Sequence, residues 1–251
     1  MSLDDNFFHI LKCRTFSGVF IMYKKGDFHI HSTVSDGNCT PKEVVNIAKK
    51  RNVDIISLTD HNTTQGLNEA ISYGNNIGIK VIPGVELSTR YNNTRVHILG
   101  YFKDESYNDD LLIHILKCVK SHKIGEIKKC LHGYIKTYYR RDNICVENGI
   151  EILRFFGANV VLAHPVLLPT DDFKEIIKLG FDGIEAKYFS NTEKDTRFFI
   201  NIAKEKNLFY TAGSDFHIFN EKHRAHGIIG DVYLNSSEIL DFLTRAELSH
   251  L

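Results

Sequence analysis

The sequence of 251 residues carries no net charge, because 31 Lys and Arg residues balance 31 Asp and Glu residues. This balance excludes the basic surface by which proteins hold nucleic acid or acidic lipid stably. No run of about 18 apolar residues occurs, so no segment is expected to span a membrane. The acidic pair Asp4 and Asp5 precedes the weakly apolar N-terminal stretch, which is the wrong charge order for a secretory signal peptide. We therefore expect a cytoplasmic protein.

Cysteine is scarce and is not arranged for a disulfide framework or a structural zinc site. The five cysteines are widely spaced, and none belongs to a C-x-x-C pair. Free thiols in a reducing compartment are the expected state of such a set. Histidine, in contrast, occurs 13 times beside only 4 Pro and 2 Met. The positions of these histidines therefore bear most strongly on function.

Short apolar runs alternate with amphipathic segments along most of the chain. The runs are rich in Ile, Val, Leu and aromatic residues, as are strands buried on both faces of a parallel sheet. Seven strands are expected, at residues 27–32, 54–59, 80–88, 95–102, 160–163, 183–187 and 209–214. Helices are expected at residues 41–52, 65–76, 171–179, 192–206 and 236–246. The first of these helices should begin at Pro41, with Thr40 as its N-cap.

Strands that alternate with helices of about 10 to 15 residues form βαβ units and a parallel sheet. Seven of them in a chain of this length favour a closed or nearly closed, TIM-like β/α barrel over an open doubly wound sheet. No G-x-G-x-x-G motif follows a strand, so a dinucleotide-binding fold has no support. A Lys-rich stretch at about residues 107–148 predicts a small helical insertion. We expect one barrel domain over residues 22–251, preceded by an N-terminal extension at residues 1–21.

Imidazoles and carboxylates recur where the expected strands end. His29 and His31 lie two residues apart, so both side chains would face the same side of a strand. Asp36 follows the same strand in an S-D-G turn, and similar candidates lie on or just after the later strands: His61, Glu86, His97, His164, Asp215 and His217. The C-terminal ends of barrel strands share one rim, which carries the active site in nearly every such barrel. Polar groups there are costly to bury without partners, so the pattern favours a cluster of divalent metal ions.

Each of these motifs also has an ordinary structural interpretation. An H-x-H pair can belong to the core or the surface, S-D-G can be a turn in which Asp caps its own backbone, and A-H-P can simply end a strand. The shared position at the same end of successive strands is what favours a common site.

In sequence order, the motifs DFHIHSTVSDG, LTDHN, PGVELS with VHILGY, LAHP and GSDFH resemble those of the PHP (polymerase and histidinol phosphatase) family of metal-dependent phosphoesterases. The resemblance extends from about Gly26 to the end of the chain. It implies a distorted (β/α)7 barrel with a site for two or three divalent metal ions. It also implies three ligand groups: His29, His31, Glu86 and Asp215; Glu86, His97 and His164; and Asp36, His61 and His217.

The resemblance further implies hydrolysis of a phosphate ester by a hydroxide that bridges two metal ions sharing Glu86. Imidazole and carboxylate ligands favour Mn²⁺, Zn²⁺ or Fe²⁺ over Mg²⁺ or Ca²⁺. Asp27 and Asp60 are each expected to orient an imidazole through its second nitrogen, and Asp60 is an alternative acid for the leaving oxygen. Lys187 and Arg224 are the expected phosphate-binding cations, with solvated surface charges as the alternative.

The motifs are most similar to the branch of the family that removes phosphate from nucleotides, including nucleoside 5′-phosphates, 3′,5′-bisphosphates and the 5′ ends of short RNA. The insertion is shorter than that branch's usual cap, and Val166 and Leu167 replace the arginine that often follows A-H-P. Other phosphomonoesters, histidinol phosphate among them, are therefore alternatives. An amidohydrolase is the rival enzyme class, although it would usually need a bridging Lys and eight strands. A non-catalytic metal-binding module is the rival outside enzymology.

Overall fold

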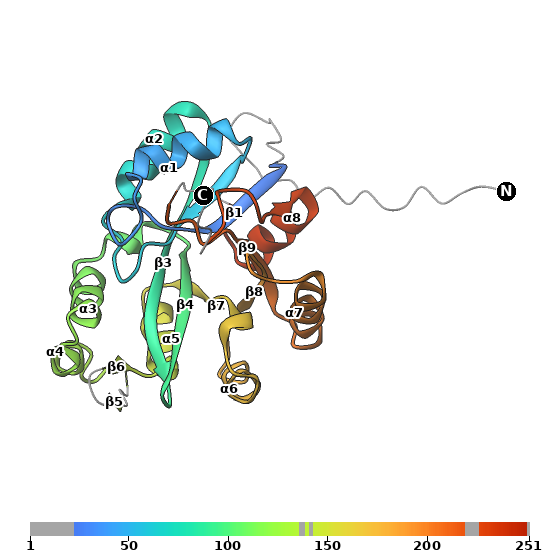
Figure 1. Cartoon of the computed structure of the whole chain (residues 1–251). Helices are drawn as coiled ribbons and strands as arrows, with labels where there is room; N and C mark the ends of the chain where they lie inside the picture. Colours follow the sequence, from blue (N-terminus) through green and yellow to red (C-terminus); the bar gives the residue numbers. More distant parts are fainter. Residues whose placement is uncertain (1–22, 136–138, 141–142, 219–225, 250–251) are drawn as a thin grey trace.

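The computed structural model of the protein describes residues 23–135, 139–140, 143–218 and 226–249 (Figure 1). The N-terminal extension expected at residues 1–21 and the cation expected at Arg224 lie outside these residues. The described part of the chain is an α/β fold in which helices surround a strongly curved sheet (Figure 1). No helix in these ranges combines the length and apolarity that crossing a membrane requires.

One eight-stranded sheet has the order β10-β1-β2-β3-β4-β7-β8-β9. Its strands are β1 (Lys25–Ile30), β2 (Ile55–Leu58), β3 (Lys80–Tyr91), β4 (Thr94–Phe102), β7 (Ala158–Leu162), β8 (Gly183–Tyr188), β9 (Phe209–Gly213) and β10 (Leu234–Asn235). The seven longer strands confirm the predicted ones to within three residues at each end. A parallel bridge between Ile30 and Phe216 brings the end of β9 against β1. The sheet is therefore a nearly closed barrel, as predicted.

The sheet is not parallel throughout, which corrects one expectation from the sequence. β4 runs antiparallel to both β3 and β7, whereas the pairs β1–β2, β2–β3, β7–β8 and β8–β9 are parallel. Only Asn92 and Asn93 connect β3 to β4, and Asn92 has a φ of 51°. Such a short connection makes a hairpin, since parallel neighbours need a long crossover. His97 therefore reaches the site from the first half of an antiparallel strand.

Helices α1 (Pro41–Lys50), α2 (Leu67–Ile77), α6 (Thr170–Ile176), α7 (Glu193–Glu205) and α8 (Ser236–Arg245) lie outside the sheet (Figure 1). They confirm the predicted helices to within three residues. The region between β4 and β7 contains η1 (Glu105–Asn108), α3 (Asp110–Lys120), α4 (Ile124–Cys130), β5 (Tyr139–Arg140), β6 (Asn143–Ile144) and α5 (Val146–Phe155), and η2 (Pro165–Leu167) follows β7. Of these elements, α5 packs on β3, β4 and β7.

The inside of the barrel becomes apolar away from the site. Alternate residues of β4 share one face, and along that face Leu99 and Tyr101 are fully buried. The Tyr101 hydroxyl donates to the carbonyl of Phe28 at 2.8 Å. Phe242 of α8 packs edge-on against both Phe28 and Tyr101. These packed apolar side chains close the barrel interior at the end away from the site and exclude water there.

Thr40 caps α1 as predicted, and the cap is a reciprocal one. The Thr40 hydroxyl accepts from the backbone N–H of Glu43 at 3.3 Å, and the Glu43 carboxylate accepts from the backbone N–H of Thr40 at 2.7 Å. We expect Thr40→Ala to lower the free energy of unfolding by about 1 kcal/mol, because it leaves helix N–H groups without an acceptor. Urea unfolding followed by circular dichroism measures this loss. Thr40→Ser keeps the hydroxyl and is the control; equal stability of all three proteins would contradict the prediction.

Candidate functional site

A buried carboxylate, that of Glu86 in the middle of β3, lies at the centre of the site. Glu86 is only 1% exposed. Its Oε2 is 3.2 Å from the Nε2 atoms of both His29 and His31, and 3.0 Å from Nδ1 of His61. His29 lies on β1 and His31 just after it, whereas His61 follows β2 and forms a parallel bridge with Glu86. Three imidazoles from two strand ends thus surround one carboxylate oxygen.

The second oxygen of Glu86 faces two further imidazoles. Its Oε1 is 2.9 Å from Nδ1 of His97 on β4 and 3.0 Å from Nε2 of His164, which follows β7. Each oxygen of Glu86 therefore faces its own group of imidazole nitrogens, three at Oε2 and two at Oε1. This is the arrangement that a carboxylate bridging two cations requires.

Asp215, in the loop after β9, completes the group around His29 and His31. Its Oδ1 is 3.3 Å from Nε2 of His29 and 3.1 Å from Nε2 of His31. Its Oδ2 accepts a hydrogen bond from the Tyr188 hydroxyl at 2.8 Å and lies 3.0 Å from Nδ1 of His226. These two contacts hold Oδ2 and leave Oδ1 directed at the imidazoles. Tyr188 is a residue that sequence reasoning missed.

Asp36, in the turn after β1, gathers a third group of imidazoles. Its Oδ2 is 3.6 Å from Nε2 of His61, and its Oδ1 is 3.4 Å from Nε2 of His217 and 3.7 Å from Nδ1 of His31. The Asp36 side chain is 52% exposed, unlike the buried Glu86. This group therefore lies on the open side of the site.

The structure brings all nine predicted residues to one place. Seven of them line a cavity of about 430 Å³, and His29 and His31 lie fully buried beside it against Glu86 and Asp215. The cavity is lined by Asp36, His61, Glu86, Arg95, His97, His164, Leu167, Leu168, Tyr188, Asp215, His217 and His226. Arg95 is the one Lys or Arg among these described lining residues, and the sequence had not suggested it.

The donor atoms of this cluster fit divalent metal ions. Among the described residues, His29 Nε2, both nitrogens of His31, His61 Nδ1 and Glu86 Oε2 are buried without a hydrogen-bond partner. Five such atoms in one place would be costly unless something else satisfied them. Ligand atoms of His29, His31, Glu86 and Asp215 lie within 4.8 Å of one another, as do those of the Asp36 group. Imidazole and carboxylate donors at this spacing could hold ions such as Mn²⁺, Zn²⁺ or Fe²⁺.

The electrostatics of the site keep its carboxylates charged and shift the pKa values of its imidazoles in opposite directions. Burial alone would raise the pKa of Glu86, but the imidazoles of His97, His29 and His61 hold that pKa well below its ordinary range. Burial opposes protonation of His31, yet its contacts with Asp215 and Glu86 raise its pKa to about 9. For His61, burial prevails and lowers the pKa to about 4.

Two of the predicted ligands lie on unusual backbone. His164 has a φ of 28° and Asp215 a φ of 52°, both in the left-handed region that non-glycine residues rarely adopt. The backbone N–H of Asp215 donates to the carbonyl of His29 at 2.9 Å. The backbone N–H of His164 donates to Glu185 Oε2 at 2.6 Å. Neighbouring strands thus hold each ligand in a conformation that the local sequence would not favour.

Glu185 is a second residue that sequence reasoning missed. It is fully buried on β8, and its Oε1 accepts from Nδ1 of His29 at 3.0 Å. When the His29 ring is neutral, this bond keeps its proton on Nδ1 and leaves the lone pair of Nε2 on the side of Glu86. A Cβ on Gly213 of β9 would overlap Glu185 Oε1, so only glycine admits this approach. The acid within the apolar run GIEAK was the available signal, since a buried carboxylate needs a partner.

Asp27 and Asp60 hold backbone and hydroxyl groups, which corrects the prediction that they orient imidazoles. The Asp27 carboxylate accepts from the backbone N–H groups of Ser214 and Gly230, at 3.0 and 2.8 Å. Burial nevertheless raises the pKa of Asp27 to about 6. Asp60 accepts from the N–H and hydroxyl of Ser32, each at 2.7 Å, and from the Ser35 hydroxyl at 2.5 Å. Asp60 is not among the residues lining the cavity, so its expected role as an acid has no geometric support.

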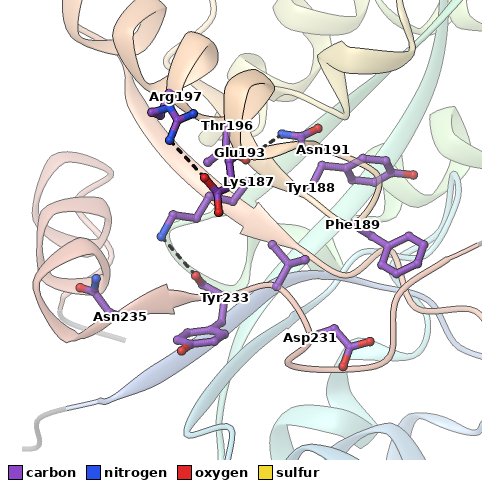
Figure 2. Close-up of a pocket in the computed structure, with 11 residues that line it drawn as sticks. Lys187, Tyr188, Phe189, Asn191, Glu193, Thr196, Arg197, Asp231, Tyr233 and Asn235 are labelled. Atoms are coloured by element: carbon purple, nitrogen blue, oxygen red, sulfur yellow. Dashed lines mark hydrogen bonds and ion pairs between the residues drawn. The ribbon is translucent and has the colours of Figure 1, made fainter.

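Lys187 does not line this cavity, contrary to expectation. Its Nζ is 2.7 Å from Glu238 Oε2, and it lines a separate cavity of about 510 Å³ together with Arg197 and Tyr233 (Figure 2). The physical reason is a shift of register between β8 and β9 that falls between Glu185 and Lys187. The shift interrupts the alternation of side chains, and the next residue, Tyr188, reaches Asp215 instead.

A model of the PHP domain matches residues 27–182 of this chain. The 3′,5′-nucleoside bisphosphate phosphatase of Chromobacterium violaceum is 43% identical over 265 residues, which cover 82% of this chain and 92% of the relative. The 5′-3′ exoribonuclease of Haemophilus influenzae is 26% identical over 250 residues, with coverages of 78% and 91%. A solved structure from Bifidobacterium adolescentis, described as a metal-dependent phosphoesterase, covers 88% of this chain and 96% of its own. Its TM-score is 0.70 at 20% identity, which shows the same fold.

Glu185→Gln is expected to weaken metal binding about 10- to 100-fold, because the amide no longer offers a charged acceptor to both His29 and the His164 backbone. Competition with a fluorescent zinc chelator measures the affinity. Glu238→Gln is the matched control, since Glu238 is also a hydrogen-bonded, partly buried carboxylate but faces Lys187 and Tyr210. Wild-type metal affinity in Glu185→Gln, with only its thermal stability changed, would restrict Glu185 to a structural role.

Metal binding should release protons and strengthen as the pH rises from 7 toward 9. The pKa of His31 is about 9, and the pKa of His29 is also raised because Glu86, Glu185 and Asp215 outweigh the effect of burial. His31 is therefore protonated at pH 7 without metal, and the raised pKa of His29 favours its protonated form, whereas a ligand imidazole must be neutral. Calorimetry in buffers of different ionisation enthalpy should show a net release of protons at pH 7. An affinity independent of pH over this range would contradict these protonation states.

Proposed function

This chain belongs to the PHP domain family and is a metal-dependent phosphoesterase, and we propose that it hydrolyses phosphate monoesters of nucleotides. The observation that carries the proposal is the position of Glu86, a buried carboxylate whose two oxygens face five imidazole nitrogens beside an accessible cavity. The names of two relatives, a 3′,5′-nucleoside bisphosphate phosphatase and a 5′-3′ exoribonuclease, favour nucleotides as the substrate class.

We propose that three groups of residues hold the metal ions. They are His29, His31, Glu86 and Asp215; Glu86, His97 and His164; and Asp36, His61 and His217. When bound, such ions lower the pKa of water and neutralise charge on phosphoryl oxygens. Two or three ions of Mn²⁺, Zn²⁺ or Fe²⁺ suit this donor set.

Neighbouring residues fix the orientation of His29 and Asp215 and exclude water from part of the site. Glu185 holds His29 through Nδ1, and Tyr188 and His226 hold one oxygen of Asp215. His29 and His31 are fully buried by the described residues, whereas seven other residues of the cluster line the cavity, so within this part of the chain water meets the cluster on the cavity side. Preorganised groups of this kind do not have to reorient as charge develops during the reaction.

The geometry favours a phosphoesterase over the two rival functions. An amidohydrolase would usually need a bridging Lys, whereas the bridging position here belongs to Glu86, and no Lys is among the described residues that line the cavity. A purely structural metal site would be closed. Here the residues of the third group border a cavity of about 430 Å³, which leaves room for a substrate.

We infer a cytoplasmic protein that acts on small phosphorylated molecules. The cysteines within the described ranges, Cys39, Cys118, Cys130 and Cys145, are all free thiols, as in a reducing compartment. The balanced net charge argues against stable binding to nucleic acid polymers. An RNA substrate would then be held mainly by its 5′ end.

A phosphate-release screen with Mn²⁺-loaded protein tests the proposal. The panel contains nucleoside 5′-monophosphates, 3′,5′-bisphosphates, 5′-phosphorylated short RNA and histidinol phosphate. We expect release from the nucleotides at higher kcat/KM than from histidinol phosphate, with activity lost on chelation. Absence of phosphate release together with hydrolysis of amides or lactones would overturn the phosphoesterase assignment.

Glu86→Gln should lower kcat in this screen by at least about 100-fold, since it removes the charge that faces both groups of imidazoles. Circular dichroism and thermal unfolding should show a folded protein. Glu69→Gln, on the outer surface of α2, is the control and should keep wild-type activity. Retained activity in Glu86→Gln would exclude Glu86 from the bridging position.

A further inference from the structure

Two arginines of the β3–β4 hairpin stand apart from the other arginines. Six arginine side chains are described, and four of them pair with a carboxylate: Arg51 with Asp231, Arg154 with Asp182, Arg197 with Glu193 and Arg245 with Asp241. Arg90 and Arg95 form no ion pair with a described residue, and Arg90 donates only to the carbonyl of Asn93 at 3.0 Å. Their positive charges are therefore not neutralised within the described part of the chain.

The register of the hairpin places these two arginines directly opposite each other. Arg90 pairs with Arg95, two residues along from the pair Ser88 and His97. Opposed residues and alternate residues along a strand share one face, so both arginines lie on the face that carries His97. Like charges in opposed positions destabilise a hairpin. A bound anion would remove this repulsion.

Arg95 also lines the cavity of the metal cluster, and it does so on the outer side. Alternate residues along β4 pass from Leu99, fully buried, through His97, whose side chain is 14% exposed, to Arg95, which is exposed. Two residues along a strand span about 6.6 Å, so Arg95 lies roughly that far beyond His97 toward the solvent. The apolar side chains of Leu167 and Leu168, which follow β7, line the same cavity.

We propose that Arg95, assisted by the charge of Arg90, forms a second anion subsite that binds a phosphate group other than the one hydrolysed. This proposal rests on the proposed function, because it takes the scissile phosphate to lie at the metal cluster. A guanidinium binds phosphate through paired N–H groups, which gives it both strength and orientation. The ligand is therefore a nucleotide with a second phosphate, either a bisphosphate or the next linkage of a short oligonucleotide.

Kinetics of Arg95→Gln test the subsite with four substrates: adenosine 5′-monophosphate, adenosine 3′,5′-bisphosphate, a 5′-phosphorylated adenylate dinucleotide and p-nitrophenyl phosphate. We expect kcat/KM to fall about 10- to 100-fold, mainly through KM, for at least one of the two substrates with a second phosphate. The monophosphate and p-nitrophenyl phosphate should change less than about threefold. Which of the two larger substrates loses most identifies the source of the second phosphate.

Matched variants separate a local effect from a general one. Arg197→Gln removes an exposed, ion-paired arginine of α7 and should leave all four values within about twofold. Arg95→Lys keeps the charge without the paired donors and should recover part of the loss. An equal loss on all four substrates would overturn the proposal, because it would place Arg95 on the scissile phosphate. No loss on any of them would also overturn it.

A binding measurement distinguishes failure of the subsite from failure of the proposed function. Calorimetry of adenosine 3′,5′-bisphosphate with the full chain, treated with EDTA, should show binding about 10-fold weaker in Arg95→Gln. If the wild-type protein hydrolyses no phosphate ester but this difference holds, the subsite stands and the proposed function fails. If phosphate is released but neither affinity nor KM depends on Arg95, the subsite fails and the function stands.

Discussion

The structure depends on one costly feature, the burial of the Glu86 carboxylate in the wall of the barrel. A buried charge needs compensating groups, and here five imidazole nitrogens surround its two oxygens. These nitrogens come from the segments around β1, β2, β4 and β7, so the carboxylate is compensated only when these strands have assembled around β3. Buried atoms without a hydrogen-bond partner, such as His29 Nε2, then form a set of ligand atoms that metal ions can use once the imidazoles are neutral.

The acidic residues of the site divide into two kinds. Glu86 and Asp215 direct oxygens at imidazoles, whereas Asp27 and Asp60 accept from backbone and hydroxyl groups and brace the loops that carry the ligands. Glu185 does both, since its Oε1 accepts from the imidazole of His29 and its Oε2 accepts from the backbone N–H of His164. Their chemistry is the same; the number and type of donors around each carboxylate sets its role.

The β3–β4 hairpin links the centre of the site to its entrance. One face of it carries Glu86, then the pair Ser88 and His97, and two residues beyond that pair Arg90 and Arg95. A paired, twisted hairpin is stiff, so the spacing between the imidazole cluster and the backbone of Arg95 is set by the strand rather than by a loop. Such a fixed spacing would select substrates by the distance between two phosphates.

The sequence by itself determined seven of the strands, five of the helices, the barrel and the nine clustered residues, because hydrophobic period, caps and the shared rim are local or topological properties. The short connection that makes β4 antiparallel is a local feature, which the prediction of a parallel sheet overlooked. The sequence could not determine that a register shift after Glu185 turns Lys187 away and Tyr188 inward. The roles of Asp27, Asp60 and Arg95 likewise depend on which distant N–H groups or cavities each side chain meets. Only the tertiary structure decides these contacts, since the partners lie far apart along the chain and pairing between strands fixes them.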